Sequence, residues 1–452
     1  MFLSVFIAYY TSIQILWGGS YMNRYWYVGL GILLTGLINI AAAQDATSLV
    51  LTEEDAVVRA TVHNISLLRF QNTLEAKKRA VDRSFNSFLP SVTVGVGAIH
   101  SNEASYDLAK WNRYGSLKTS LSLSVGTFYD IETIKQQYEA QKISYEQAKK
   151  SLELSVRKYF KGLLLAEENL QLLSQNLQTA QKNYEEVLKK QKVGLASETE
   201  ALSALVTVEN LKPRLVSARA SYVNQLETLK QLIGIESSVV VTLQGKLERP
   251  NTTKLADLTR LLKEASPSPD EQSLRSQLIV AEMNRKATVA STTLPSLSFS
   301  WTYQPTAGGT TSNWVDQGSL SIALNWSVDS LLPFSSAGES RDTLMDTIRD
   351  LHYQIEDARK NAELTRSSYV REIEQYLTAL ESYQANERLA QRSLELTQLA
   401  YNNGLADFIS VQNAADDLAE VRYSILEYTY NLSITLLNLE YSLGLPFGTL
   451  GR

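Results

Sequence analysis

Two long stretches of the chain carry an apolar or small residue at every seventh position, which is the spacing of a helix that packs along partner helices. In both stretches the next step of seven reaches a glycine, Gly194 or Gly404. The rows comprise Ile131, Tyr138, Tyr145, Leu152, Tyr159, Ala166, Leu173, Ala180 and Val187 in the first stretch and Ile348, Ile355, Ala362, Tyr369, Tyr376, Tyr383, Ala390 and Thr397 in the second. Each pattern predicts a helix of about 60 residues, roughly 90 to 100 Å long, which needs neighbours to cover its apolar stripe.

The helical pattern resumes after each of these glycines, from Leu202 to Val223 in the first stretch and from Val411 to Leu432 in the second. Glycine beside short side chains suits a tight reversal between antiparallel helices, because it adopts backbone conformations that other residues avoid. The sequence therefore predicts long helical hairpins that reverse at Gly194 and Gly404.

Ahead of each long helix the period of the pattern changes from seven to two, which is the alternation of a β-strand with one apolar and one polar face. The apolar-face positions are Val92, Val94, Val96 and Ala98, then Leu117, Thr119, Leu121, Leu123 and Val125, and later Leu297, Phe299, Trp301 and Tyr303, then Leu320, Ile322, Leu324, Trp326 and Val328. Alternation of about this length is typical of a membrane-barrel strand, apolar toward lipid and polar toward a wet lumen. A soluble hairpin packed on the helices would show the same pattern.

Four such strands cannot close a barrel, and a bilayer tolerates no open sheet edge. Strands that span a membrane would therefore belong to several protomers sharing one barrel, and three protomers would give twelve strands. Phe128, Trp301, Tyr303 and Trp326 are the candidates for aromatic residues at the interfaces of that barrel.

Three short phrases recur in the same order, which indicates that one unit occurs twice. They are Val-Gly-Leu at 193–195 and Asn-Gly-Leu at 403–405, Leu-Ile-Gly at 232–234 and Ser-Leu-Gly at 442–444, and Leu-Pro-Ser at 89–91 and again at 294–296. We expect repeat 1 at residues 44–235, with a helix, a strand hairpin, a long helix and a return helix. A linker at 236–268, repeat 2 at 269–447 and a C-terminal tail at 448–452 would follow.

The first residues predict a secreted protein. Arg24 precedes an apolar run from Tyr25 to Ile40 that ends in the three alanines at 41–43. These are the n-region, the h-region and the small-residue cleavage site of a secretory signal peptide. We expect residues 1–43 to be an upstream extension and this signal peptide, with translation starting at Met22. The alternative, a membrane anchor through both apolar stretches, is interrupted by polar residues and glycines.

The composition excludes several classes of function. Among 452 residues the net charge is −5, which gives no electrostatic reason to bind nucleic acid, and cysteine is absent, so disulfides and thiolate chemistry are excluded. His63, His100 and His352 are isolated, and no nucleophile elbow, phosphate-binding loop or zinc-helix motif occurs. We therefore expect no enzyme and no catalytic, cofactor-binding or metal-binding residue. The acidic pair Glu53-Glu54 is interpreted as a solvated helix face.

The order of strand hairpin, very long helix, glycine reversal and return helix ending in Leu-Ile-Gly, present twice, resembles the TolC family of outer-membrane efflux and secretion channels. The resemblance covers about residues 50–447 and includes the Leu-Pro before the first strand of each copy. It implies a mainly α fold with β-barrel strands, in which a homotrimer forms a twelve-strand barrel in outer-membrane lipid and a twelve-helix tunnel in the periplasm. It also implies, as partners, a periplasmic membrane-fusion adaptor protein and an inner-membrane transporter of the RND, ABC or MFS type.

The same resemblance implies that the hairpin turns lie at the periplasmic tip, where Gly194, Leu195, Gly404 and Leu405 would dock the adaptor. Well-known members carry aspartates six and nine positions after the second tip glycine, forming charged rings at the constriction. The candidates for lining the aperture of this chain are Glu198, Glu200, Tyr401, Asp407, Ser410 and Asn413. Because Ser410 and Asn413 occupy the two aspartate positions, we do not expect that charged gate.

Together these features predict a passive export duct in the outer membrane of a diderm bacterium, with its helical part in the periplasm. It would serve a tripartite efflux or type I secretion system. The alternative is a periplasmic or surface-attached coiled-coil protein that acts as a spacer or adhesin without channel activity.

Overall fold

The computed structural model describes residues 49–100, 111–250, 262, 266–307 and 313–451, and the predicted signal peptide lies outside these ranges. The chain forms two compact parts, of which the larger comprises Val50–Ser237 and Leu243–Arg452. In the smaller part the structure describes Leu49 and residues 238–242, where the N–H of Leu49 donates to the carbonyl of Val240 (2.8 Å). The short strands β1 (Leu49–Leu51) and β4 (Val241–Leu243) each cross the boundary between the parts.

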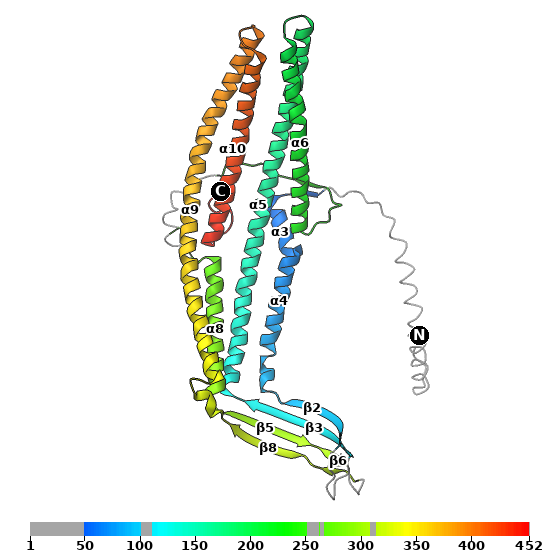
Figure 1. Cartoon of the computed structure of the whole chain (residues 1–452), viewed down its shortest axis with the longest axis vertical. Helices are drawn as coiled ribbons and strands as arrows, with labels where there is room; N and C mark the ends of the chain where they lie inside the picture. The colour runs from blue at the N-terminus through cyan, green and yellow to red at the C-terminus, as the bar shows by residue number, and fades with distance from the viewer. Residues whose placement is uncertain (1–48, 101–110, 251–261, 263–265, 308–312, 452) are drawn as a thin grey trace, which may run out of the picture. The chain divides into compact units, whose positions relative to one another are not determined.

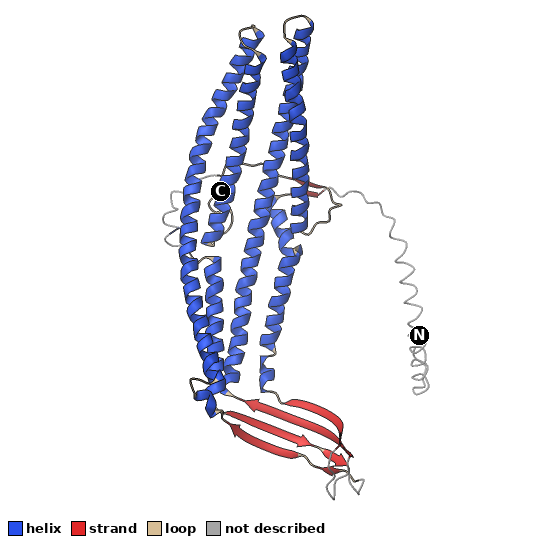
Figure 2. Cartoon of the chain, in the orientation of Figure 1, coloured by secondary structure: helices blue, strands red, loops and turns tan. Residues whose placement is uncertain are grey.

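The larger part is mainly helical (Figures 1 and 2). Its described α-helices include α3 (Glu53–His63), α4 (Ile65–Asp82), α5 (Val125–Lys192), α6 (Glu198–Leu232), α8 (Pro269–Thr293), α9 (Ser336–Asn402) and α10 (Phe408–Leu443). The long helices α5 and α9 reverse into α6 and α10, which pack against them, and this confirms the predicted helical hairpins. α8 packs against both α5 and α9, and α10 also contacts α5. No helix among the described residues combines the length and the apolar character needed to cross a bilayer.

Capping side chains determine where the long helices begin. Ser124 accepts a hydrogen bond from the backbone N–H of Thr127 (3.2 Å) at the start of α5, and Ser335 caps α9 in the same way. The sequence predicts a strand as far as Val125, whereas the strand ends at Leu123. The cap is the physical reason for this difference, because Ser124 already belongs to the helix start.

Buried side chains of α9 and α10 form a hydrophobic core between these helices. Its buried members in these helices are Ile373, Leu380, Leu432, Leu436, Leu439 and Leu443, and Leu450 beyond the end of α10 joins them. The ring of Tyr428 lies 5.8 Å from that of Tyr376 and 5.1 Å from that of Tyr383, so tyrosines of the heptad row pack in this seam. Each buried leucine stabilises the helix pair by about 1.5–3 kcal/mol.

An antiparallel sheet follows the N-terminal ends of the long helices (Figure 1). Its strands are β2 (Ser91–His100), β3 (Trp111–Leu123), β5 (Ser296–Tyr303) and β8 (Ser319–Asn325), with the short strands β6 (Pro305–Ala307) and β7 (Val315–Asp316). The long strands are ordered β2-β3-β5-β8, which confirms the predicted strands. The last one is shorter than predicted, because Val328 belongs to the 3-10 helix η3 (Val328–Leu331). A second 3-10 helix, η1 (Ser84–Phe88), precedes β2.

Single side chains join helices end to end. The amide of Asn64 accepts the N–H of Leu67 (3.1 Å) at the start of α4 and donates to the carbonyl of Leu232 (2.9 Å) at the end of α6. In the second copy, the guanidinium of Arg366 donates to carbonyls at the end of α10 and just ahead of α8. The helices before the strands are thus aligned with the return helices of the same copy.

Candidate functional site: the sheet faces and the helix turns

The strand register aligns apolar residues of neighbouring strands on one face of the sheet. Val94 of β2 pairs with Leu117 of β3, which pairs with Tyr303 of β5. Further rows run through Thr119, Trp301 and Leu320, through Leu121, Phe299 and Ile322, and through Leu123, Leu297 and Leu324. These residues form one continuous surface, here called the apolar sheet face.

The apolar sheet face is open to the surroundings in a single chain. Val96 is 88% exposed, Val94 is 76% exposed and Leu324 is 71% exposed. Soluble monomers rarely expose a contiguous apolar surface of this kind, because covering it with lipid or protein releases water from it. The face is therefore built to contact another phase or another chain.

The outer strands of the same sheet have unpaired edges. Among the described strands, β2 pairs with β3 alone and β8 pairs with β5 alone. A row of free N–H and C=O groups along a strand is a template for pairing with another strand. The sheet is thus extendable on both sides.

The opposite face of the sheet is polar. The hydroxyls of Ser91 and Ser120 lie 2.8 Å apart across β2 and β3, and the amide of Asn325 donates to the hydroxyl of Ser298 (2.9 Å) across β8 and β5. A side chain on Gly97 would meet the ring of Tyr114, which covers this part of the face. Serine and threonine predominate along these rows, so the face suits water rather than lipid.

The predicted barrel aromatics occupy three different settings. Trp301 and Tyr303 lie in β5 on the apolar sheet face. Trp326 follows β8, and its indole N–H donates to the carbonyl of Thr293 (3.1 Å). Phe128 lies in the first turn of α5 and not in a strand, with its ring 5.1 Å from that of Phe88. Phe128 therefore belongs to the junction between helices and strands.

The turns of the helical hairpins are closed by the same backbone motif. Gly194 and Gly404 have φ of 76° and 74°, and the N–H of the following leucine donates to the carbonyl five residues earlier at 2.8 Å in both turns. This is the Schellman closure of a helix, which requires a residue that tolerates positive φ. Leu195 is 77% exposed and Leu405 is 82% exposed, although a residue at this position often packs against its helix. Each turn thus has an exposed leucine at its surface.

Side chains of the two hairpins meet just below these turns. Val187 of α5, Ala201 and Ala204 of α6 and Phe408 of α10 form a buried cluster, here called the tip cluster. Tyr401 of α9 packs against it, with its ring 5.9 Å from that of Phe408. The tip cluster is small and consists mainly of short side chains, so little apolar area holds the hairpins together there.

Tyr401 also links the hairpins through polar contacts. The Nζ atom of Lys190 in α5 lies 4.1 Å from the centre of the Tyr401 ring, and it donates to the side chain of Asn402 (3.5 Å). Burial raises the pKa of Tyr401, and the carboxylates of Glu200 and Glu186 raise it further. Its hydroxyl is buried and lacks a hydrogen-bond partner among the described residues.

Two of the acidic aperture candidates, Glu200 and Asp407, take part in helix caps. Glu200 accepts the backbone N–H of Ser197 (2.7 Å) at the start of α6. Asp407 accepts the N–H of Ser410 (2.8 Å) and the Ser410 hydroxyl (2.5 Å) at the start of α10. These bonds, that of the hydroxyl first, lower the pKa of Asp407. The structure thus gives Glu200, Asp407 and Ser410 a local role that the sequence analysis missed.

The remaining candidates, Glu198 and Asn413, are exposed on α6 and α10. Glu198 lies in the first turn of α6 and Asn413 in the second turn of α10, close in sequence to the capping residues. They are therefore free to contact solvent or another chain.

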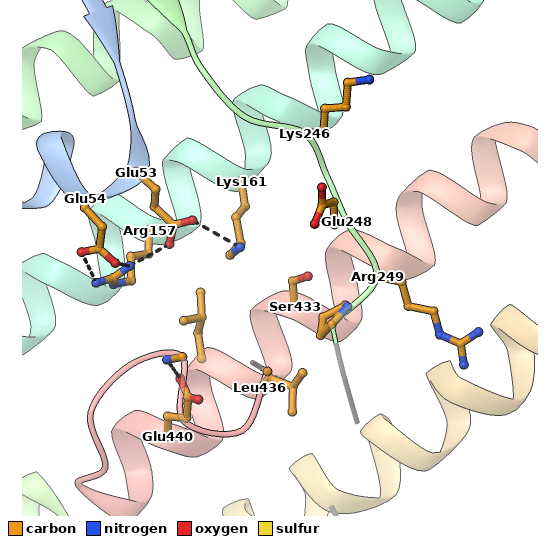
Figure 3. Close-up of a pocket in the computed structure, with 14 residues that line it drawn as sticks. Glu53, Glu54, Arg157, Lys161, Lys246, Glu248, Arg249, Ser433, Leu436 and Glu440 are labelled. Carbon is orange, nitrogen blue, oxygen red and sulfur yellow. Dashed lines mark hydrogen bonds and ion pairs between the residues drawn. The ribbon is translucent and has the colours of Figure 1, made fainter. Parts of the chain in front are cut away.

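A charged cluster joins α3 and α5 in the middle of the larger part (Figure 3). The side chain of Arg157 is 9% exposed and donates to Glu53 (3.0 Å), Glu54 (2.9 Å) and Glu153 (2.8 Å). Burial alone would lower the pKa of Arg157, but its hydrogen bonds with the three carboxylates raise it. The interpretation of Glu53-Glu54 as a solvated face is therefore wrong for the side chain of Glu53, which is 24% exposed and also pairs with Lys161 (3.4 Å).

Glu440 of α10 lies across a pocket of about 270 Å³ from this cluster (Figure 3). It is 1% exposed and accepts the backbone N–H groups of Gly448 (2.8 Å) and Leu450 (2.6 Å). Burial raises the pKa of Glu440, against the opposing effect of these N–H groups and of Arg157. Within the described ranges, no group of histidine, cysteine or acidic residues is arranged to hold a metal ion.

Comparison with known proteins agrees with this geometry. Residues 56–235 match the family described as outer membrane efflux protein. The chain is similar to members of this family over that segment. The outer membrane protein TolC of Escherichia coli (strain K12) is 21% identical over 438 residues, which cover 92% of this chain and 85% of TolC. The location of the chain is accordingly the outer membrane, with its helices in the periplasm.

Solved structures of related channels have the same fold. A crystal structure of CusC matches with a TM-score of 0.73 at 15% identity, covering 90% of this chain and 96% of that chain. The outer membrane protein VceC from Vibrio cholerae matches with a TM-score of 0.71 at 15% identity, covering 87% of this chain and 96% of that chain. The duplicated arrangement of long helices and strands is thus TolC-like, as the sequence predicts.

Proposed function

We propose that three copies of this chain form a passive channel through which solutes leave the periplasm across the outer membrane. The observation that carries the proposal is the four-strand sheet, with its apolar face exposed and the outer edges of β2 and β8 unpaired. A bilayer admits such strands only when every edge is paired, and a sheet this narrow cannot close on itself. Pairing β8 of one copy with β2 of the next would remove all edges.

In the closed barrel, the apolar sheet face contacts lipid and the polar face lines the lumen. The exposures of Val94, Val96 and Leu324 fit this orientation, because these side chains would otherwise face water. The serine and threonine rows fit a water-filled interior. The helices would continue the passage into the periplasm.

The helix turns are proposed to form the periplasmic end of the channel and to dock an adaptor protein. Leu195 and Leu405 are exposed although they are apolar, and Val193 beside them is 70% exposed. Partner helices with small or apolar residues would cover these side chains and gain their burial. An inner-membrane transporter behind the adaptor would supply the energy, since the chain itself carries no catalytic motif.

The contacts of Tyr401 are proposed to hold the channel end in a narrow state. They join α9 and α10 to α5 and α6 through the tip cluster and through Lys190. Few side chains are involved, so displacement of one hairpin costs little. Separation of the hairpins at this level would widen the passage, and Glu198, Glu200, Asp407, Ser410 and Asn413 lie beside it.

Membrane fractionation and planar-bilayer recording test the channel itself. We expect the full chain in the outer-membrane fraction, as a trimer that dissociates on heating, and a defined conductance from the purified trimer. A monomer in the soluble periplasm would overturn the proposal. A membrane-bound trimer without conductance would favour a spacer or adhesin instead.

The turn leucines test the docking proposal. We expect Leu195→Asn combined with Leu405→Asn to reduce pump-dependent export strongly, because the partner loses its apolar contacts. The matched control is Leu195→Met combined with Leu405→Met, which keeps the apolar area and should keep export. Both variants should retain trimer yield and single-channel conductance. Normal export by the asparagine variant would exclude these leucines as docking residues.

A further inference from the structure

Lys118 is the charged side chain on the polar face of the sheet. It lies in β3 on the same face as Ser116 and Ser120, and the register pairs it with Thr93 of β2 and Thr302 of β5. At every other described position of this face in β2, β3, β5 and β8 the residue is uncharged. The polar face therefore carries a net positive charge from one residue.

The surroundings of Lys118 leave this charge uncompensated. Its neighbours across and along the strands are hydroxyl side chains, which are neutral. The side chain is exposed, and no acidic residue in the described ranges forms an ion pair with it. A lysine ammonium group without a counter-charge attracts anionic solutes that pass it and repels cationic ones.

We propose that Lys118 raises the permeability of the channel to anionic solutes relative to cationic solutes. This inference rests on the proposed function, because it takes the polar face as the wall of the lumen. In a threefold channel the three Lys118 side chains form one ring of positive charge at a single level. Rings of like charge are a general means by which pores distinguish ions by sign.

The size of the effect follows from Coulomb's law in water. A unit charge on the wall acts on a solute about 10 Å away, at a distance comparable to the screening length of physiological salt. Three such charges change the permeability of each ion by about twofold in opposite directions, so neutralising the ring should change the ratio of anion to cation permeability by about fourfold. Reversal of the charge should change it by about fifteenfold.

Arg113 provides a matched control on the same strand. It is five positions from Lys118, so it projects from the opposite face, in line with Leu117 and Leu121. It is exposed, and it lies near the N-terminal end of β3, where a long cationic side chain can reach the membrane surface. Removal of Arg113 changes the net charge of the chain equally without changing the polar face.

Reversal potentials in a potassium chloride gradient across a planar bilayer test the proposal with the full trimer. We expect Lys118→Gln to lower the chloride-to-potassium permeability ratio about fourfold and Lys118→Glu to lower it about fifteenfold. Arg113→Gln should leave the ratio unchanged. The proposal is overturned if the Lys118 variants conduct with the ratio of the unchanged protein, or if Arg113→Gln produces the same shift.

A chemical variant of the test avoids any effect on assembly. The chain has no cysteine, so Lys118→Cys introduces a single thiol that can be modified after the trimer has inserted. An anionic thiosulfonate reagent should lower the permeability ratio, and a cationic one should restore it to that of the unchanged protein. Arg113→Cys should respond to neither reagent, because its side chain lies outside the lumen.

The outcomes separate this inference from the function on which it rests. Absence of conductance from the unchanged protein would overturn both. A conducting trimer whose ratio is insensitive to the charge at position 118 would leave the channel intact and overturn the role of Lys118. An equal change of the permeability ratio on modification of both cysteine variants would show that the assigned faces are wrong.

Discussion

The turns at the hairpin tips and those in the middle of the bundle share a backbone motif but have different surroundings. Gly194 at a tip and Gly234 in the middle have φ of 76° and 70°, and in both turns the next N–H closes a 2.8 Å bond to the carbonyl five residues earlier. A Cβ atom on Gly194 would meet no atom within 4 Å, whereas one on Gly234 would lie 2.6 Å from the Cβ of His63. The tip turn requires glycine only for its positive φ, whereas the turn in the middle also requires the absence of a side chain, because His63 lies against it.

The basic side chains of the two regions differ in the same way: the one in the middle is closely surrounded, and the one at the tip has few contacts. Arg157 is buried in the middle of the bundle and bound by carboxylates of Glu53, Glu54 and Glu153. At the tip, Lys190 contacts the face of Tyr401, an interaction worth about 0.5–1 kcal/mol at an exposed site. The middle is therefore held by buried ion pairs, while the two hairpins are joined at the tip by weak contacts, which cost less to break. This difference is what the proposed gate requires.

The largest expected effect is that of Arg157→Ala. It leaves Glu153 without its cation and Glu53 with Lys161 alone, in a poorly hydrated site, which costs about 3–5 kcal/mol in the free energy of unfolding. The change would be measured by thermal unfolding of the detergent-solubilised protein, followed by far-UV circular dichroism.

The matched control for Arg157 is Arg349→Ala. Arg349 pairs with Asp346 at 3.0 Å, but its side chain is 62% exposed. Exposed ion pairs contribute about 0–1 kcal/mol because water screens them. Equal losses for the two variants would contradict the claim that the middle of the bundle depends on its buried charges.

A smaller effect is expected from alanine at the two glycines compared above. Gly234→Ala adds a steric overlap with His63 to the strain of a positive φ, for a cost of about 3 kcal/mol. Gly194→Ala has the strain alone, for about 1 kcal/mol. Thermal unfolding of the two variants gives the comparison directly, and a Gly194 variant as unstable as the Gly234 variant would show that the tip is more crowded than a single chain indicates.

The sequence predicts the fold well because period and repetition are local signals. The heptad rows predict the helical hairpins, and the period of two predicts the strands. The ends of the elements do not follow from the period, because one capping residue outweighs the pattern. Alternation continues to Val125, yet Ser124 caps α5, which begins at Val125. Ser197-x-x-Glu200 is a capping box whose signature is readable in the sequence.

The charged middle of the bundle could not be predicted from the sequence. Arg157 meets Glu53 across 104 positions of the chain, and nothing local distinguishes Glu53-Glu54 from a solvated acidic pair. Glu440 likewise receives its hydrogen bonds from residues beyond the end of α10, in what the sequence presents as a tail. Long-range pairing of polar groups leaves no periodic signal, so the structure was needed to find it.

The smallest expected effect concerns pH, because two carboxylates that accept backbone N–H groups have opposite pKa shifts. Glu440 is buried in the middle, and burial raises its pKa above the ordinary value. Its contribution to stability is complete below that ordinary value and is lost as the pH rises through the raised pKa. Asp407 is exposed at the tip, and the bonds from Ser410 lower its pKa. Its contribution is complete above the ordinary value and is lost as the pH falls through the lowered pKa.

The isosteric variants Glu440→Gln and Asp407→Asn remove these two titrations. Thermal unfolding across the acidic pH range should show the unchanged protein losing stability relative to Glu440→Gln as the pH rises through the raised pKa. The same protein should lose stability relative to Asp407→Asn as the pH falls through the lowered pKa. In Glu440→Gln an amide replaces the carboxylate that accepts two backbone N–H groups, and this lowers the stability by the same amount at every pH. It therefore does not change how the stability depends on pH. If the stability difference between the unchanged protein and its variant changed with pH in the same direction for Glu440→Gln and Asp407→Asn, burial would not decide the protonation of Glu440. The contrast between a buried carboxylate in the middle and an exposed one at the tip would then be contradicted.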